Sequence, residues 1–252
     1  MAPERAPGDH YSELAKGYAI FRPRYPRELF EFVASVAPAR HRAWDCGAGS
    51  GQATLDLAQH FDHVIGTDVS AEQIAQAPRH PKIEWHAAPA ENVPMIASRS
   101  IDLITVAQAL HWFDHEKFYA EARRVAVPNG VLAAWTYATP TMQGEVGKVL
   151  RRYMHDDVGA YWPPERKYVD DEYRTIPFPF ERISAPAITL ENDWTLDQIL
   201  GYMRTMSATA RYIKATGIDP VAPVEREMRV LWGNPGPRRI VWPLIVLAGR
   251  VS

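Results

Sequence analysis

The chain of 252 residues contains a single cysteine, Cys46, and no long hydrophobic run. One cysteine excludes an internal disulfide and a zinc or iron–sulfur site built from cysteines, and it fits a reducing compartment. The longest apolar stretch, residues 240–249, is about half the length of a membrane-spanning helix and is interrupted by Pro243. An excess of one charge is also missing, because 28 lysines and arginines stand against 30 aspartates and glutamates. Neither a nucleic acid nor a membrane surface is therefore expected as a partner.

The N-terminus lacks the apolar segment of a secretory signal, since Pro3, Glu4 and Pro7 fall where that segment would lie. We therefore expect a cytoplasmic protein, either a monomer or a homodimer. With 46% hydrophobic and 23% charged residues, the composition is that of an ordinary globular protein rather than a disordered chain or a coiled coil.

Between residues 40 and 136, short β-branched runs alternate with amphipathic segments, a pattern typical of successive βαβ units. Two helix starts are marked, one by Ser70 with Gln73 three residues later and one by Asp114. The pattern predicts an α/β fold with a doubly wound, Rossmann-like, mostly parallel seven-stranded sheet, an antiparallel last strand, and a ligand at the carboxyl ends of the strands. The expected strands are residues 42–45, 64–68, 83–86, 101–106 and 131–135, and the expected helices are residues 54–61, 70–77 and 115–125.

After the fifth strand the pattern changes, because residues 137–182 are rich in tyrosine, arginine and proline and show weak periodicity. Residues 187–190 predict a strand, Thr195 begins a capping box before a helix, and residues 239–246 predict the last strand, with Pro243 at a bulge or an edge. We predict one domain, made of an N-terminal arm or lid (1–40), a cofactor-binding core (41–136), an insertion that caps the substrate (137–186) and a C-terminal part (187–252).

The most informative segment reads Trp-Asp-Cys-Gly-Ala-Gly-Ser-Gly-Gln, a strand end followed by glycines at every second position. Gly47, Gly49 and Gly51 let the backbone bend against a ligand, and the helix start after them offers free N–H groups; an ordinary glycine turn is the alternative. Gln52 stands where a nicotinamide or flavin motif has a small residue, and no P-loop lysine follows, so both of those sites are excluded. Asp45 can orient the loop or accept from an amino group of the ligand.

Asp68 lies at the end of the second expected strand, 21 residues after Gly47. A carboxylate at this place can accept hydrogen bonds from both hydroxyls of a ribose. Taken alone, Asp68 could equally be a helix cap or a turn residue. Together with the glycine loop at this spacing, it points to a nucleoside cofactor.

These segments, taken in order, resemble the motifs of class I S-adenosylmethionine-dependent methyltransferases. The N-terminal segment and the segment after the fourth strand are similar to the small-molecule branch that includes trans-aconitate methyltransferase-like proteins, and the resemblance covers nearly the whole chain. The methyltransferase motifs are residues 44–52, Asp68, 88–94, 100–104 and 124–130, and the branch motifs are residues 18–26, 107–114, 232–235 and 242–244.

The resemblance implies that S-adenosylmethionine is the cofactor. The backbone around the three glycines would hold its methionine part, Asp68 its ribose, and Val69 the face of its adenine. The remaining cofactor contacts implied by the resemblance are Ala90 and Glu91 at the adenine edge, Gln108 and Ala109 along the methionine carboxylate, and Arg22 as its ion-pair partner.

The resemblance also places a methyl acceptor next to His111. Methyl transfer is an in-line displacement with a neutral leaving group, so positioning is needed in every case, whereas a base is needed only if the acceptor must lose a proton. His111 is the candidate base, with packing as the alternative; a metal shared with His115 is not expected, because the spacing offers no third ligand. Aromatic residues expected to surround the acceptor are Tyr18, Phe21, Tyr25, Trp112, Trp135 and Tyr137.

We therefore expect a methyltransferase acting on oxygen, nitrogen or carbon of a small acceptor, a carboxylate or an aromatic metabolite. The acid preference follows from the resemblance and from Arg22, Arg24, Arg204 and Arg211. Two alternatives stay open: a non-catalytic S-adenosylmethionine-binding regulatory protein, and an RNA or protein methyltransferase. The arm, residues 1–26, is expected to close over the ligand crevice as a lid.

Overall fold

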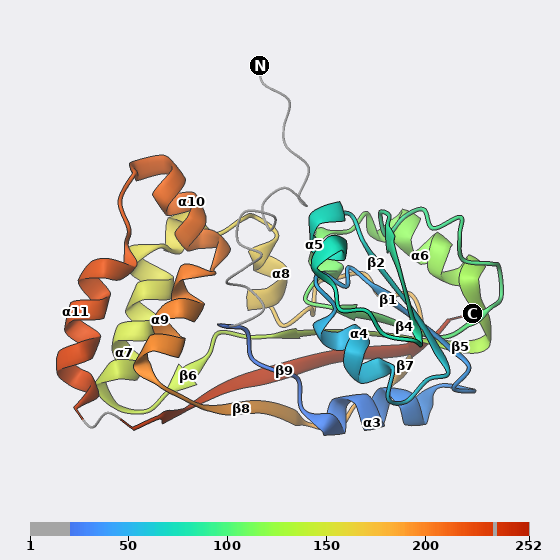
Figure 1. Cartoon of the computed structure of the whole chain (residues 1–252), viewed down its shortest axis with the longest axis horizontal. Coiled ribbons are helices and arrows are strands. Elements are labelled where there is room, and N and C mark those ends of the chain that lie inside the picture. Colours follow the sequence, from blue (N-terminus) through green and yellow to red (C-terminus); the bar gives the residue numbers. More distant parts are fainter. Residues whose placement is uncertain (1–20, 234–235, 252) are drawn as a thin grey trace, which may run out of the picture.

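The computed structural model describes residues 21–233 and 236–251. Most of the arm predicted as a lid, including Tyr18, lies outside these residues. In Figure 1 the chain forms a sheet lobe and a helical lobe, which are joined by the long strands β8 (Ile188–Trp194) and β9 (Arg238–Arg250). In the described part of the chain, no helix is long and apolar enough to cross a membrane.

The sheet lobe contains the predicted parallel sheet. Its strands run in the order β3-β2-β1-β4-β5, and each pair of neighbours is parallel, which confirms the doubly wound α/β class. The five strands are β1 (Arg42–Cys46), β2 (His63–Asp68), β3 (Ile83–Ala87), β4 (Ile101–Ala107) and β5 (Ala126–Tyr137).

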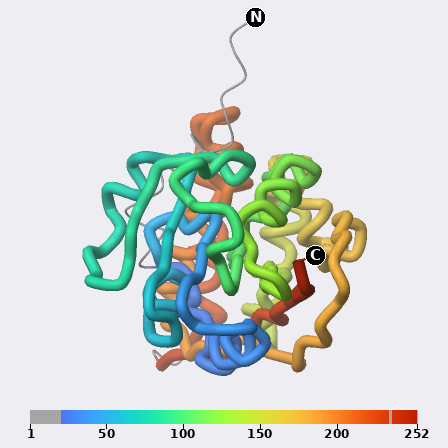
Figure 2. The backbone as a smooth tube through the Cα atoms, turned by 90° about the vertical axis from the view of Figure 1, so that its right-hand side faces the viewer, coloured from blue at the N-terminus to red at the C-terminus, as the bar shows by residue number. Residues whose placement is uncertain are grey.

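Side chains alternate between the two faces of this sheet, as the period of a strand requires. On one face, Ala43 and Leu103 pack under α3 (Arg27–Val36) and α4 (Gln52–Leu57). On the other face, Trp44 and Ile104 pack against α6 (His115–Val125). The end view in Figure 2 shows α6 in green on the opposite side of the strands from α4 in cyan.

Both predicted caps at helix starts are present. The Ser70 side chain accepts from the Gln73 N–H at the start of α5 (Ala71–Gln76), and the Asp114 carboxylate accepts from the Lys117 N–H at the start of α6. The pairing of β4 with β5 shifts register between Ile101 and Leu103, and on the β5 side of this shift Asn129 has a φ of 63°.

Around β9 the sheet is larger than predicted, with nine strands rather than seven among the described residues. β9 pairs antiparallel with β5 and β6 (Thr141–Met142) along one edge, and with β7 (Glu181–Ile183) and β8 along the other. Pro243 lies inside β9, at the point where one edge passes from β5 to β6. Its missing N–H faces this edge, where neither β5 nor β6 pairs with Pro243, and its carbonyl accepts from the Ala138 N–H at 3.1 Å.

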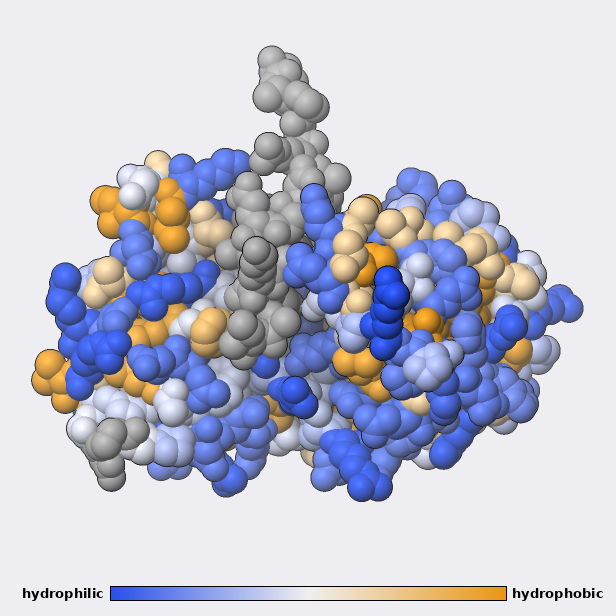
Figure 3. All heavy atoms as spheres, viewed as in Figure 1, coloured by the Kyte–Doolittle hydropathy of each residue, from blue (hydrophilic) through white to orange (hydrophobic). Residues whose placement is uncertain are grey.

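The helical lobe is built from two separate stretches of chain, one after β6 and one between β8 and β9. They share a core with the far ends of β8 and β9, in which Trp194 and Trp242 lie 4.9 Å apart between ring centroids. The predicted capping box at Thr195 is present. Hydrophilic residues predominate on the face in Figure 3. The helices of this lobe are α7 (Gly144–Arg152), a π-helix η2 (Tyr153–Asp157), η3 (Gly159–Tyr161), α9 (Leu196–Arg204), α10 (Ser207–Thr216) and α11 (Val221–Trp232). The short helix α8 (Arg166–Asp170) lies between the two lobes in Figure 1 and buries Val169 in the core of the sheet lobe.

Candidate active site

A cavity of about 390 Å³ opens at the carboxyl ends of β1 and β4, where an open parallel sheet binds its ligands. We call it the loop cavity, because the glycine loop between β1 and α4 forms one wall. It is lined by Arg24, Tyr25, residues 47–53, Leu55, Asp56, Gln76, Pro78, Ala107, Gln108 and Tyr137.

The three glycines of the loop all have left-handed backbones, with φ of 70°, 56° and 93° at Gly47, Gly49 and Gly51. A Cβ at Gly47 would lie 2.6 Å from the Ala109 Cβ, and one at Gly51 would lie 2.5 Å from the Trp85 ring. A Cβ at Gly49 would meet no atom within 4 Å. Two glycines therefore permit close packing of the loop, while Gly49 leaves open space for a ligand.

Asp45 lies beneath the loop and is fully buried. Its carboxylate accepts from the Thr54 hydroxyl at 2.6 Å and from the Thr105 hydroxyl at 2.8 Å, which ties β1 to α4 and β4. Of the two predicted roles, these contacts support orientation of the loop. Burial raises the pKa of Asp45 from 3.8 to about 6, since desolvation outweighs the two hydrogen bonds.

This raised pKa predicts the pH dependence of stability. Between about pH 4 and pH 6 the folded state binds the Asp45 proton and the unfolded state releases it, so rising pH lowers the free energy of unfolding. Asp45→Asn removes this term. We expect the free energy of unfolding of the variant, relative to that of wild type, to rise by on the order of 3 kcal/mol as pH rises from about 4 to 7. Urea unfolding of both proteins across this range measures it, and a pH-independent difference would contradict it.

Asp68 lies at the end of β2 and is tied to the glycine loop. One carboxylate oxygen accepts from the Gly49 N–H at 2.8 Å and the other from the Ser70 N–H at 2.9 Å. Burial raises the pKa of Asp68 above its ordinary value, although the two hydrogen bonds lower it. The next side chain, Val69, is 56% exposed, so it offers an apolar surface at the end of the strand.

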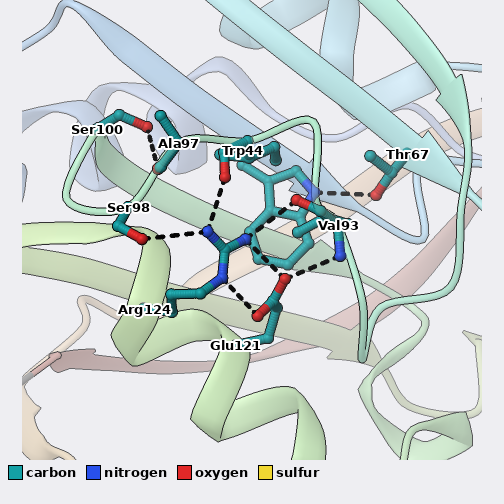
Figure 4. Close-up of polar contacts among 9 residues, drawn as sticks. Trp44, Thr67, Val93, Ala97, Ser98, Ser100, Glu121 and Arg124 are labelled. Carbon is teal, nitrogen blue, oxygen red and sulfur yellow. Dashed lines mark hydrogen bonds and ion pairs between the residues drawn. The ribbon is translucent and has the colours of Figure 1, made fainter.

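Ala90 and Glu91 lie on the segment after β3, outside the loop cavity. Ala90 is buried, and the Glu91 carboxylate accepts from the Asp114 N–H at 2.9 Å. Figure 4 shows how α6 holds the segment that follows: Glu121 accepts from the Val93 N–H at 2.8 Å, and Arg124 donates to the carbonyl oxygen of Val93 at 3.0 Å. The segment is therefore fixed by the helix beside it.

Gln108, directly after β4, has a φ of 57°, which is rare for a residue with a side chain. Its Oε1 accepts from the Thr136 hydroxyl at 2.9 Å, whereas its buried Nε2 has no hydrogen-bond partner among the described residues. A strained backbone and an unpaired buried donor are typical of a ligand site. Ala109, the next residue, packs against Gly47 rather than lining the cavity.

A second cavity of about 70 Å³, the inner cavity, shares Gln108 and Tyr137 with the loop cavity. Arg22 reaches it from before α3, donating to the Tyr137 hydroxyl at 3.1 Å and to the carbonyl oxygen of Thr205 at 3.0 Å. The described lining contains two guanidinium groups and no carboxylate. The lining residues are Arg22, Gln108, His111, Trp112, Tyr137, Ala138, Pro140, Met154, Trp162, Pro163, Arg166, Val169, Tyr202, Met206 and Ser207.

His111 lines the inner cavity, and its Nδ1 lies 2.8 Å from the Tyr173 hydroxyl. Burial lowers the pKa of His111 from 6.5 to about 3, with smaller contributions from Arg166 and His115. The imidazole is therefore neutral at physiological pH and resists protonation, which disfavours the predicted role as a general base. His115 Nε2 lies 3.0 Å from the carbonyl oxygen of Leu110, and the described residues contain no cluster of three metal-ligating side chains.

Comparison with known proteins agrees with this geometry. A family model described as a methyltransferase domain matches residues 44–134. A Dictyostelium discoideum protein named as a methyltransferase is 37% identical over 224 residues, which cover 87% of this chain and 85% of that protein. A solved structure from Anaeromyxobacter dehalogenans, described as a type II methyltransferase, has 46% identity and a TM-score of 0.85, covering 92% of this chain and 98% of that one.

The chain belongs to the class I S-adenosylmethionine-dependent methyltransferases. The predicted family is thereby confirmed, while the trans-aconitate branch stays a prediction. The cavities of this methyltransferase fit the family's cofactor: the open space at Gly49 suits a ligand against the loop, and the unpaired Gln108 amide suits an acceptor such as a carboxylate.

Asp68→Ala is expected to weaken binding of S-adenosylhomocysteine to the methyltransferase by about 1.5–3 kcal/mol, or about 10- to 150-fold. The variant removes a charged acceptor and, with it, the hydrogen bond that the Gly49 N–H donates to Asp68. Isothermal titration calorimetry measures the dissociation constant. Asp62→Ala is a matched control, because Asp62 is an exposed aspartate just before β2. An unchanged dissociation constant in the Asp68 variant would remove Asp68 from the site.

Two predicted acceptor contacts lie elsewhere in the methyltransferase. Trp135 is fully buried in the core of the sheet lobe, with its ring at right angles to Phe30 at 6.1 Å, because its position in β5 faces the sheet's covered side. Phe21 packs against Gly201 in α9, where a Cβ would meet its ring at 2.5 Å. Arg204 is also outside both cavities, since it pairs with Glu225 at 2.7 Å.

Besides His111, three of the aromatic residues predicted to surround the acceptor line a cavity. Trp112 lines the inner cavity, Tyr25 the loop cavity, and Tyr137 both. Sequence reasoning missed Trp162 and Arg166, which come from the insertion with weak periodicity, where no local motif marks them. It also missed Trp85, whose only signal is the register that places it opposite Gly66.

Proposed function

We propose that this methyltransferase transfers a methyl group from S-adenosylmethionine to a small acidic acceptor, and that the acceptor binds in the inner cavity. The observation that carries the proposal is the boundary between the two cavities: Gln108 and Tyr137 line both, so a ligand in the loop cavity and one in the inner cavity meet there. Arg22 and Arg166 give the inner cavity its preference for an anion.

The residues of the chain have separate tasks in this proposal. The loop around Gly49, with Asp68, Val69, Ala90 and Glu91, would hold the cofactor, which supplies an electrophilic methyl group on a sulfonium when bound. Gln108 would donate from Nε2 to a ligand oxygen at the boundary.

The inner-cavity side chains would orient the acceptor and exclude water. Trp112, Trp162 and Tyr202 form apolar walls, and the two guanidinium groups fix the acid. A carboxylate that accepts the methyl group loses no proton, which agrees with a His111 that stays neutral. The reaction then depends on positioning rather than on a base.

An acceptor screen tests the proposal. The protein is incubated with a metabolite extract and isotope-labelled S-adenosylmethionine, and the labelled products are identified by mass spectrometry. We expect labelled small acids. Binding of S-adenosylhomocysteine without any labelled product would favour the non-catalytic regulatory protein. Label that appears only on RNA or protein would contradict the small acceptor.

A further inference from the structure

A third cavity, of about 290 Å³, lies beside the inner cavity on the side of the insertion; we call it the outer cavity. The inner and outer cavities share Met154, Trp162, Pro163 and Arg166 as lining residues. They therefore lie on either side of a partition made by these side chains. The partition includes the start of α8, which lies between the two lobes in Figure 1.

Specific contacts hold the side chains of the partition in place. The Arg166 guanidinium donates to Asp170 at 2.7 Å and to Thr139 at 3.0 Å, and it lies 4.3 Å from the centre of the Trp162 ring. Trp162 is held in turn by its Nε1, which donates to the carbonyl oxygen of Met154 at 2.9 Å. Arg166 is thus fixed on the boundary of both cavities.

Met154 belongs to the π-helix η2, a rare turn that is frequent at functional sites. The Val158 N–H donates to the carbonyl oxygen of Tyr153 at 3.0 Å, which is the five-residue spacing of such a turn. The π-helix therefore lies in the segment that contains Met154, whose carbonyl oxygen accepts from Trp162 Nε1.

The outer cavity is cationic. Arg166 and Lys167 line it, and its single described carboxylate, on Asp170, is already used by Arg166. The Lys167 ammonium lies 5.0 Å from the centre of the Tyr168 ring, and no carboxylate of the described residues forms an ion pair with it. One exposed cation beside a fixed guanidinium is suited to a second anionic group.

The sizes of the two cavities indicate how a ligand would divide between them. The inner cavity has a volume of about 70 Å³, whereas the outer cavity, at about 290 Å³, is about four times larger. With the cofactor in the loop cavity, an acceptor that outgrows the inner cavity would extend past Arg166 into the outer cavity.

We propose that the outer cavity is a second acceptor subsite, which binds an anionic group, carboxylate or phosphate, at the far end of an elongated acceptor whose reacting end lies in the inner cavity. Lys167 and Arg166 are its ligands. This inference rests on the proposed function and makes it more specific: the acceptor carries two acidic groups.

Binding of simple acids tests the subsite. The probes are α,ω-dicarboxylates of increasing chain length, with monocarboxylates of the same length for comparison, added to protein saturated with S-adenosylhomocysteine. We expect the best dicarboxylate to bind about tenfold more tightly than its monocarboxylate, the effect of one charge-assisted hydrogen bond. Lys167→Gln is expected to abolish that advantage without weakening the monocarboxylate, and Lys167→Arg to retain it. ω-Phosphonocarboxylates distinguish phosphate from carboxylate.

Lys148→Gln is the matched control, because Lys148 is an exposed lysine of α7 that pairs with Glu145 and lines none of the three cavities. If dicarboxylates and monocarboxylates bind wild type equally, or if Lys167→Gln keeps the advantage, the second subsite is wrong while the acidic acceptor stands. If no acid binds although S-adenosylhomocysteine does, the acidic acceptor fails and the subsite fails with it.

Discussion

Gly49→Val is expected to abolish binding of S-adenosylhomocysteine, with at least about a 100-fold rise in the dissociation constant, and to leave a folded protein. Gly49 has a φ of 56° and lines the loop cavity, and a Cβ there would point into open space. A branched side chain would occupy that space and would be strained in the left-handed region. Calorimetric titration measures the affinity, and circular dichroism measures the fold.

The control separates occupied space from backbone strain. Gly217 ends α10 with a φ of 73°, a Cβ there would also meet nothing within 4 Å, and it lines none of the three cavities. Gly217→Val should therefore cost similar stability and leave the affinity unchanged. Retained binding in the Gly49 variant, or an equal loss in both variants, would show that the loop does not face the ligand.

The glycine loop and the helix caps could be predicted because their signals are local. The spacing of Gly47, Gly49 and Gly51 after a strand, and the caps at Ser70 and Asp114, depend on a few neighbouring residues, and the structure contains each of them. The distinct tasks of the glycines could not be predicted. Gly51 is small because Trp85, 34 positions later, packs against it, and that contact follows from the pairing of β2 with β3.

The prediction of seven strands was wrong for a similar reason, since the sheet of the described residues has nine. β9 is long enough to pair with four strands, and this pairing supports β6 and β7, which are only two and three residues long. Segments this short carry no period that a sequence can reveal. Trp135 shows the opposite limit. Its place at the end of the fifth expected strand suggested the ligand side, whereas its register in β5 directs its side chain into the core.

The anionic preference of the inner cavity also depends on contacts that the sequence does not signal. Four arginines were available from the sequence, and of these the structure places Arg22 at the inner cavity and Arg24 at the loop cavity. Arg166, which was not among them, reaches the inner cavity through contacts with Asp170, Thr139 and Trp162. Its role requires the insertion to fold against the sheet lobe, which no local pattern predicts.

Arg166→Gln is therefore expected to lower kcat/KM for the acceptor found in the screen by about 10- to 150-fold, the loss of a charge-assisted hydrogen bond of about 1.5–3 kcal/mol. The affinity for S-adenosylhomocysteine should stay unchanged, because Arg166 does not line the loop cavity. Arg166→Lys should recover only part of the loss, since an ammonium lacks the planar fork that binds a carboxylate through two parallel bonds. Arg239→Gln, at an exposed arginine paired with Glu191, is the control for charge alone. An Arg166→Gln enzyme with wild-type kcat/KM would place the acid of the acceptor elsewhere, and equal losses in both variants would reduce the effect to the net charge of the protein.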